Sequence, residues 1–306
     1  MRRSRALVPV LLAVGVVLVS AAALARALIR DADDIGRALR DASWQWLVPA
    51  AMLALLSIPC LAERWRAALR LLGTSVPLGV AVRDFSAGQL GKYVPGGVWQ
   101  FVGQGELAAR RGIPRRAAYA SVMLSTLCLV GGAALIVAAA GLSAVANSTT
   151  WWTVAVGATV VTTLLVRPGR LAMARLLKLD APVRAGEIAR NVLGALPTWL
   201  LIGTATWMAT RSMVDLPVVD VITAAVASWL AGIVFLPAPG GIGVREAVFA
   251  ASLVSIDPSV SPGTAAVIAL IARVLFMCAD AAWLPLGRLV TRDAESWRAP
   301  SSTAAA

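Results

Sequence analysis

The sequence contains no histidine and only three cysteines among its 306 residues. Histidine is the commonest general base near neutral pH and a frequent ligand of zinc, haem and di-iron centres, so its absence argues against those chemistries. Cys60, Cys128 and Cys278 all lie within apolar segments. There they act as small buried hydrophobic side chains rather than as disulfides or metal ligands. We therefore expect no metal site and no cofactor.

Charged residues are also scarce, at 14% of the chain. An average soluble domain carries about 25%. Hydrophobic residues make up 59%, and the mean hydropathy is +0.78. Several uncharged runs reach the length of about 20 residues that a helix needs to cross a bilayer core. This combination predicts a membrane protein rather than a soluble one with an unusually apolar core.

Acidic residues are few relative to basic ones, with 16 Asp and Glu against 28 Lys and Arg. A net charge of +12 in a soluble protein would suggest nucleic acid as the partner. The arginines lie mainly between apolar spans and are not interleaved with aromatic residues, so we expect no nucleic acid partner. Their placement suits anionic phospholipid headgroups, to which each nearby cation contributes about 1 kcal/mol.

The apolar runs predict an all-α integral membrane protein with about eight transmembrane helices. The expected spans are residues 6–25, 44–62, 117–141, 151–166, 192–210 and 218–236, a short apolar helix ending at residue 256, and residues 263–286. Most Lys and Arg fall on one side if both termini, residues 62–116, residues 167–190 and Arg245 are cytoplasmic, as the positive-inside rule requires. We thus predict a multi-pass protein of the bacterial cytoplasmic (inner) membrane.

The first span admits a second interpretation, because Ala23-Leu24-Ala25 resembles a signal-peptide cleavage site. Its apolar run is longer than a usual signal sequence and further spans follow, so we favour a retained helix. The predicted organisation is one transmembrane domain over residues 1–290, with half-repeats at 1–166 and 167–290. A disordered cytoplasmic tail is expected over residues 291–306.

Two segments carry the strongest helix-breaking signals, the runs Pro95-Gly96-Gly97 and Pro239-Gly240-Gly241. Proline removes a backbone donor and glycine frees the dihedral angles, so each run interrupts apolar helical sequence. Unpaired backbone at membrane depth must be buried in protein or line a watery cavity. Ordinary surface turns also use proline and glycine, and that alternative stays open.

Each break follows an even-numbered span, which predicts two four-span halves in the same orientation with interruptions at matching positions. Matching interruptions are the best sequence pointer to the substrate site of a transporter. A helix that restarts after the break directs its positive end and its free N–H groups toward it, which suits a phosphate. Lys92 and Arg245 flank the breaks and add full positive charge.

Two charged residues in the last span, Arg273 and Asp280, lie seven residues apart and so share one helix face. A charge at mid-membrane costs at least about 2.5 kcal/mol, so it usually faces a polar cavity or a partner. Glu246, Glu106 and Lys92 are the candidate partners, in a functional or a purely structural role. The complete set of predicted substrate-binding residues is Gln89, Lys92, Tyr93, Pro95, Gly96, Gly97, Trp99, Gln100, Gln104, Glu106, Pro239, Gly240, Gly241, Arg245, Glu246, Arg273 and Asp280.

The two broken segments resemble the paired signatures of the lysylphosphatidylglycerol synthase transmembrane (flippase-like) family. The first reads Gln89-x-Gly91-Lys92-Tyr93-x-Pro95-Gly96-Gly97-x-Trp99, and the second reads Pro237-x-Pro239-Gly240-Gly241-x-Gly243-x-Arg245-Glu246. The resemblance spans about residues 7–290. It implies an eight-helix module, which in fused members flips aminoacylated phosphatidylglycerol made by a soluble C-terminal synthetase domain. Only about 20 residues follow the last span here, so we expect a stand-alone member without lysyl-transfer activity.

These features favour a non-enzymatic translocase for an anionic phospholipid, an aminoacyl-phospholipid or a polyprenyl-linked headgroup. A membrane-embedded enzyme acting on lipid phosphate or a lipid-linked sugar is an alternative, with Glu106, Glu246 and Asp280 as acid–base groups and Tyr93 as a donor. A third interpretation is a non-transporting subunit, with the basic segment 167–190 docking a soluble or membrane enzyme.

Overall fold

The computed structural model describes residues 42–93, 98–141, 166–176, 182–234, 243–290 and 297–299. Every regular element within these ranges is a helix, which confirms the predicted all-α class. The predicted span 6–25, residues 151–165 of the predicted span 151–166, and both proline–glycine runs lie outside the described residues.

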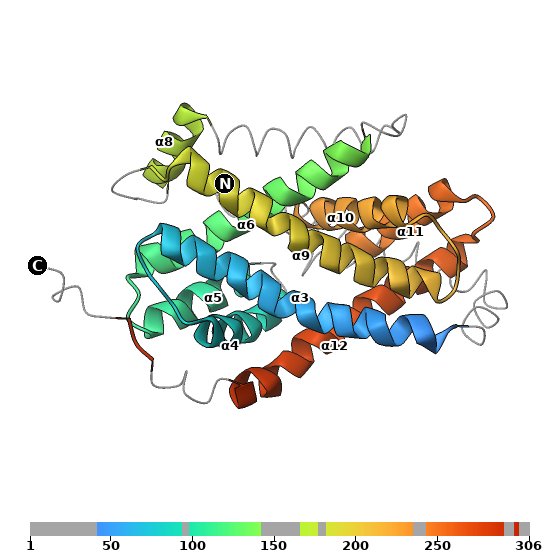
Figure 1. Cartoon of the computed structure of the whole chain (residues 1–306), viewed down its shortest axis with the longest axis horizontal. Coiled ribbons are helices and arrows are strands. Elements are labelled where there is room, and N and C mark those ends of the chain that lie inside the picture. The colour runs from blue at the N-terminus through green and yellow to red at the C-terminus, as the bar shows by residue number, and fades with distance from the viewer. Residues whose placement is uncertain are drawn as a thin grey trace, which may run out of the picture.

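Nine α-helices and one 3-10 helix (η1) follow one another along the described chain (Figure 1). They are α3 (Trp44–Leu71), α4 (Leu78–Gln89), η1 (Leu90–Tyr93), α5 (Trp99–Arg110), α6 (Arg115–Gly141), α8 (Arg167–Leu176), α9 (Ala185–Arg211), α10 (Val218–Val234), α11 (Val244–Ile256) and α12 (Pro262–Val290).

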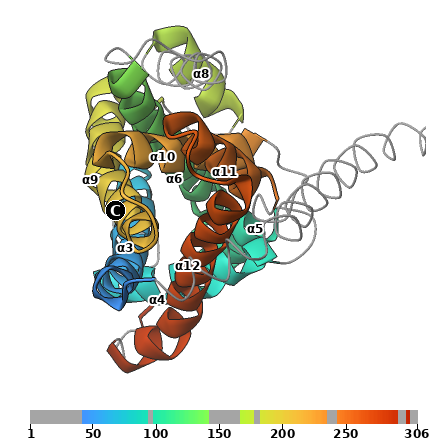
Figure 2. The same cartoon turned by 90° about the vertical axis from the view of Figure 1, so that its right-hand side faces the viewer.

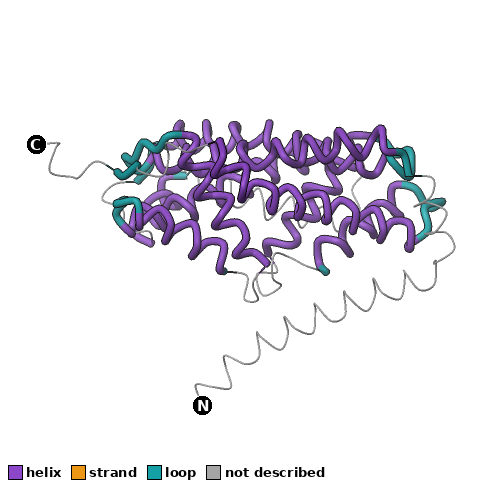
Figure 3. The backbone as a smooth tube through the Cα atoms, turned by 90° about the horizontal axis from the view of Figure 1, so that it is seen from below, coloured by secondary structure: helices purple, strands orange, loops and turns teal. Residues whose placement is uncertain are grey.

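Four of these helices, α3, α6, α9 and α12, are long and apolar enough to cross a membrane. The candidate spans within them have 26 to 28 residues each. At 1.5 Å per residue this gives about 40 Å, which exceeds the hydrocarbon thickness of about 30 Å. The described loops gather at the two ends of the elongated bundle (Figure 3). The chain is therefore a multi-pass helical membrane protein, as predicted.

Four other helices are shorter and form two pairs. Helices α4 and α5 have 12 residues each and pack against one another, and we call them the first short pair. Helices α10 and α11, with 17 and 13 residues, form the second short pair. Their lengths correspond to roughly 18 to 26 Å. Figure 1 shows the first short pair toward one end of the bundle and the second toward the other.

The same order of elements occurs twice, as a long helix, a short pair and a second long helix. Helices α3 and α9 pack against each other in opposite directions, since Ser43 N at the start of α3 donates to Ser212 O at the end of α9 (2.9 Å). Helices α6 and α12 also run in opposite directions (Figure 1). The described halves are thus inverted, not parallel as the sequence predicted. That prediction matched α3 with α10, whereas the order of elements matches α3 with α9.

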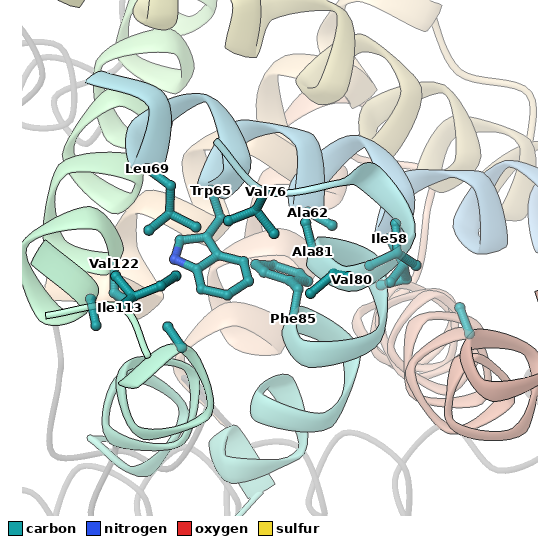
Figure 4. Packing of buried hydrophobic residues seen from close by; sticks show 14 of the residues in the cluster. Ile58, Ala62, Trp65, Leu69, Val76, Val80, Ala81, Phe85, Ile113 and Val122 are labelled. Atoms are coloured by element: carbon teal, nitrogen blue, oxygen red, sulfur yellow. The ribbon is translucent and has the colours of Figure 1, made fainter. Parts of the chain in front are cut away.

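The largest buried cluster joins the first short pair to α3 and α6 (Figure 4). Its centre is Trp65 of α3, whose ring centroid lies 6.4 Å from that of Phe85 on α4. The indole N–H of Trp65 donates to Ser121 Oγ of α6 (2.9 Å), so this buried polar atom is satisfied. Within the first short pair, Gly88 lets α4 approach α5 closely, because a Cβ there would lie 2.9 Å from Gln104 N.

A tryptophan from α12 satisfies a carbonyl that a proline leaves free in α3. Pro59 lies inside α3 and has no N–H to donate to Leu55 O, four residues earlier. The indole N–H of Trp283 donates to Leu55 O instead (2.7 Å). A kink-prone position in a membrane helix is thereby fixed to a second helix, as expected where no water can reach the freed group.

The end of the bundle that carries most of the arginines is closed by a buried ion pair. Arg111 donates through Nε and Nη2 to both carboxylate oxygens of Asp84 (2.7 and 2.8 Å). Arg111 O accepts from Ala299 N (2.8 Å), and Arg111 Nη1 donates to Trp297 O (3.3 Å). Residues 297–299 of the predicted tail therefore pack on this end, and its other residues lie outside the described chain. Helix α8 lies at the edge of the bundle (Figure 2).

We predict that Trp283→Phe lowers the free energy of unfolding by about 1–3 kcal/mol, because Leu55 O is left buried without a donor. In a Pro59→Ala background the same substitution should cost less, since the introduced alanine supplies the missing N–H. Unfolding of the four proteins by SDS titration in mixed micelles measures this coupling. Equal costs in both backgrounds would contradict the assignment.

Candidate functional site

A cavity of about 210 Å³ lies between the two short pairs and the long helices. Residues from η1, from all four helices of the short pairs and from α3, α6, α9 and α12 line it. The charged residues on its wall are Lys92, Arg245, Glu246, Arg273 and Asp280. The sequence singled out all five, although they come from three separate segments of the chain.

Neutral polar, aromatic and aliphatic residues form the rest of the lining. The glutamines Gln89, Gln100 and Gln104 were predicted to belong to the site. Sequence reasoning did not identify the hydroxyl and aromatic groups Ser57, Phe85, Phe101, Ser125, Thr126, Trp199, Thr206, Ser228, Trp229, Phe249 and Phe276. Isolated Ser, Thr and Trp are ordinary in membrane helices, so these positions give no distinctive signal without the packing of the bundle.

Lys92 and Tyr93, at the end of η1, both bind Asp280 of α12. Lys92 Nζ lies 2.5 Å from Asp280 Oδ2, and the Tyr93 hydroxyl donates to the same oxygen (2.6 Å). The side chain of Asp280 is 1% exposed and that of Lys92 is 16% exposed. A carboxylate this deeply buried is stable only with such compensation. The inner end of the first short pair is therefore joined to α12.

The second short pair contacts α12 through an ion pair in which α12 supplies the cation and not the anion. Arg273 Nε of α12 lies 3.5 Å from Glu246 Oε1, in the first turn of α11. Glu246 Oε2 accepts from Gly243 N (2.7 Å), which caps the start of the helix. The spacing Gly243-x-x-Glu246 places an acidic residue at the third helical position, a capping signal readable in the sequence. A carboxylate thus occupies the helix end at which we expected a phosphate.

Helix α12 is consequently the common partner of both short pairs. Arg273 and Asp280 are seven residues apart and lie on one face, as their spacing predicts. Of the partners offered by the sequence, the structure uses Glu246 and Lys92. The Tyr93 ring bridges the two pairs, with Lys92 Nζ at 5.3 Å and Arg273 Cζ at 6.0 Å from its centroid.

Arg245 differs from the other two cations of the cavity. Within the described part of the chain it forms no ion pair, and its guanidinium carbon lies 6.0 Å from the Trp229 ring centroid. Its path depends on Gly232 of α10, where a Cβ would overlap Arg245 Cγ and lie 2.7 Å from Cδ. Gly232 therefore provides the space in which Arg245 reaches the cavity.

A family model for the lysylphosphatidylglycerol synthase TM region matches residues 10–278, which is most of the chain. The chain belongs to this family. A search of curated proteins gives no match. Membership confirms the resemblance carried by the two broken segments, and it identifies the chain as a lysylphosphatidylglycerol synthase TM-region protein.

In this family member some predicted site residues lie elsewhere. Glu106 faces the arginine-rich end, with Arg115 Nη2 at 3.3 Å and Arg110 Nε at 3.9 Å, and is absent from the described cavity wall. Trp99 is about half exposed and likewise does not line the cavity. Arg245, which the sequence assigned both to the cytoplasmic side and to the substrate site, lies on the cavity wall. The glycines and prolines of both breaks, Pro95, Gly96, Gly97, Pro239, Gly240 and Gly241, lie outside the described residues.

The Lys92–Asp280 pair yields a stability prediction. Lys92→Met should lower the free energy of unfolding by about 3–5 kcal/mol, because it leaves a buried carboxylate without its cation. The double variant Lys92→Met with Asp280→Asn should recover most of that loss. Both are measured by SDS titration, and a double variant no more stable than Lys92→Met would show that burial of the charge is not the cause.

The Gly232 contact yields a second prediction. Gly232→Ala should leave the bundle folded, because alanine favours a helix, while it displaces the Arg245 side chain. For short-chain phosphatidylglycerol, a lipid of the class that we propose below as the substrate, the affinity measured by microscale thermophoresis in detergent should fall about tenfold for the loss of one charge-assisted contact. Gly186→Ala is the matched control, since its Cβ would meet no atom within 4 Å. Equal affinities of the two variants would contradict this role for Gly232.

Proposed function

We propose that this protein translocates a lipid with an anionic, phosphate-bearing headgroup across the membrane. The observation that carries the proposal is the convergence of Lys92, Arg245 and Arg273 on one cavity inside the bundle. Cations at membrane depth are expensive, and they commonly mark the path of a substrate. Acyl chains can remain in the bilayer during transfer, so the headgroup alone requires a polar site.

The charges of the cavity favour a negatively charged ligand. Three cations face two carboxylates, Glu246 and Asp280, and each carboxylate has its own cationic partner. Arg245 is left as the cation with no carboxylate of the described chain bound to it. Its planar guanidinium matches a phosphate with two parallel hydrogen bonds. The glutamines and hydroxyls around it supply neutral donors for the rest of a headgroup.

We further propose that the two short pairs are re-entrant hairpins that enter from opposite membrane faces. No helix of the first pair is long enough to span, and the described halves are inverted. The arginine-rich end, with Arg110, Arg111 and α8, is assigned to the cytoplasm by the positive-inside rule. On this topology α10 and α11 form one hairpin instead of two crossings, and both termini stay cytoplasmic.

This arrangement supports alternating access. One hairpin would separate the cavity from the cytoplasmic leaflet and the other from the opposite leaflet, as inverted repeats do in many transporters. Both hairpins contact α12 through charged side chains that line the cavity. A headgroup that exchanges partners with those side chains can therefore favour the movement of one hairpin over the other.

The test is the movement of fluorescent NBD-phosphatidylglycerol in proteoliposomes, followed by dithionite quenching. We expect the protein to accelerate movement above empty liposomes, and Lys92→Ala and Arg245→Ala to slow it about 10- to 100-fold, because each loses a charge-assisted phosphate contact. Arg110→Ala is the control, since Arg110 is exposed and lies outside the cavity.

Equal rates for wild type, both cavity variants and the control would remove the site assignment. No acceleration by the wild-type protein with phosphatidylglycerol, a lysylated phosphatidylglycerol or a polyprenyl phosphate would remove the transport proposal. Conversion of any of these lipids to a new product by the purified protein would instead favour the membrane-enzyme alternative.

A further inference from the structure

One carboxylate oxygen of Asp280, a residue of the cavity wall, lacks a hydrogen-bond partner among the described residues. Asp280 is 1% exposed, and its Oδ2 accepts from both Lys92 and Tyr93. Asp280 Oδ1 is also buried, and it has no hydrogen-bond partner among the described residues. Buried polar atoms are normally paired, and an exception of this kind points to a ligand or to a change of state.

The other carboxylate of the cavity is in a different situation. Glu246 uses one oxygen for Gly243 N and the other for Arg273. Both its oxygens are occupied by contacts that stabilise the start of α11. Asp280 thus differs from Glu246 in two ways. One of its buried oxygens has no hydrogen-bond partner among the described residues. Its cationic partner, Lys92, is also a residue that we propose binds the substrate.

Binding of a phosphate to Lys92 changes the surroundings of Asp280. The Lys92 ammonium would turn toward the phosphate, and the carboxylate would lose its cation while a second negative charge arrives nearby. A carboxylate that loses its cation while a like charge enters the same buried site is destabilised in its ionised form, which favours uptake of a proton by one of the two anions. Of the two, a phosphodiester is the far stronger acid, so the carboxylate is the group that accepts the proton.

We propose that Asp280 is a proton-binding site that couples proton movement to lipid movement in the same direction. This proposal rests on the proposed function. The headgroup phosphate binds Lys92 and Arg245, and Asp280 Oδ1 takes one proton from water. After the cavity opens to the other side and the headgroup leaves, Lys92 returns to Asp280 and the proton is released there. For a phosphodiester lipid of charge −1, lipid and proton cross together without net charge.

The charged groups facing Asp280 are consistent with this step. Lys92 and Tyr93 come from η1, Arg245 and Glu246 from α11, and Arg273 from α12 itself. The residues that α3, α4 and α9 contribute to the described cavity wall are all neutral. Lys92 is the mobile partner among them, because it has a flexible chain and three rotatable donors.

Protonation also gives Asp280 a function in binding. An ionised carboxylate can only accept hydrogen bonds, whereas a protonated one carries a donor. The new O–H at Oδ1 can donate to a phosphate oxygen or to a headgroup hydroxyl. The empty cavity would hold Asp280 ionised and paired with Lys92, and the loaded cavity would hold it neutral and hydrogen-bonded to the cargo.

The test uses proteoliposomes of phosphatidylethanolamine and phosphatidylglycerol that contain NBD-phosphatidylglycerol, with an imposed difference of one pH unit. One coupled proton converts that difference into an up to tenfold change in the leaflet ratio of the probe, because one pH unit is a factor of ten in proton activity. The probe should accumulate in the leaflet that faces the higher pH. Dithionite quenching measures the leaflet ratio of the probe. In Asp280→Asn this ratio should be the same whether the pH is higher inside or outside the proteoliposomes.

Asp220→Asn is the control variant, since Asp220 is exposed in the first turn of α10. It should keep the gradient dependence of the wild type. Probe movement in the wild type with a leaflet ratio that ignores the gradient would overturn proton coupling and leave the transport proposal intact.

A second measurement does not require transport. Short-chain phosphatidylglycerol added to the protein in weakly buffered detergent should cause uptake of up to one proton per protein, read with a pH-sensitive dye. Uptake should be lost in Asp280→Asn and kept in Asp220→Asn. Binding without uptake would overturn the proposal, because it would mean that Lys92 serves phosphate and carboxylate together. Uptake without any probe movement would support Asp280 as the proton site and remove translocation.

Discussion

Two ion pairs inside the bundle, Lys92–Asp280 and Arg273–Glu246, organise the structure. Charges at membrane depth are stable only when a partner or water compensates them. Each ion pair joins one short pair of helices to α12. One face of α12 therefore supplies the oppositely charged partner that each of the other two side chains, Lys92 and Glu246, needs inside the bundle. The same requirement brings the inner ends of both short pairs to one cavity. Packing of the aromatic cluster around Trp65 and the contact of Trp283 with α3 then hold the surrounding helices in place.

Because the two halves are inverted, the two ion pairs join α12 to short pairs at opposite ends of the bundle. Helix α12 contacts the first short pair through the Asp280 carboxylate and the second through the Arg273 guanidinium. In the function that we propose, a headgroup phosphate would compete with the carboxylates for the cations, and the two contacts would respond in different ways. Lys92 can release Asp280, whereas Glu246 is also bound to the backbone of Gly243 and is held more firmly. We therefore expect the substrate-dependent change to be concentrated at Asp280.

Much of this could be read from the sequence. Long uncharged runs predicted α3, α6, α9 and α12, and the periodicity of a helix placed Arg273 and Asp280 on one face. The sequence did not predict the orientation of the halves. Helix α4 is too polar and too short to be counted as membrane-inserted, so the sequence pattern matches α3 with α10 and not with α9. The sequence also did not predict the contacts of Glu106 and Gly232. It does not tell which side of the helix bundle a carboxylate faces or which side chain packs against a glycine.

The cavity has Lys92 and Arg245 on its wall. We propose that both short pairs end at this cavity inside the bilayer. A cryo-EM structure of the protein in lipid nanodiscs tests this most directly. We expect Lys92 and Arg245 in the central part of the membrane, with Lys92 against Asp280 and Arg273 against Glu246. A structure that places Lys92 and Arg245 at opposite membrane surfaces, without a common cavity, would contradict it.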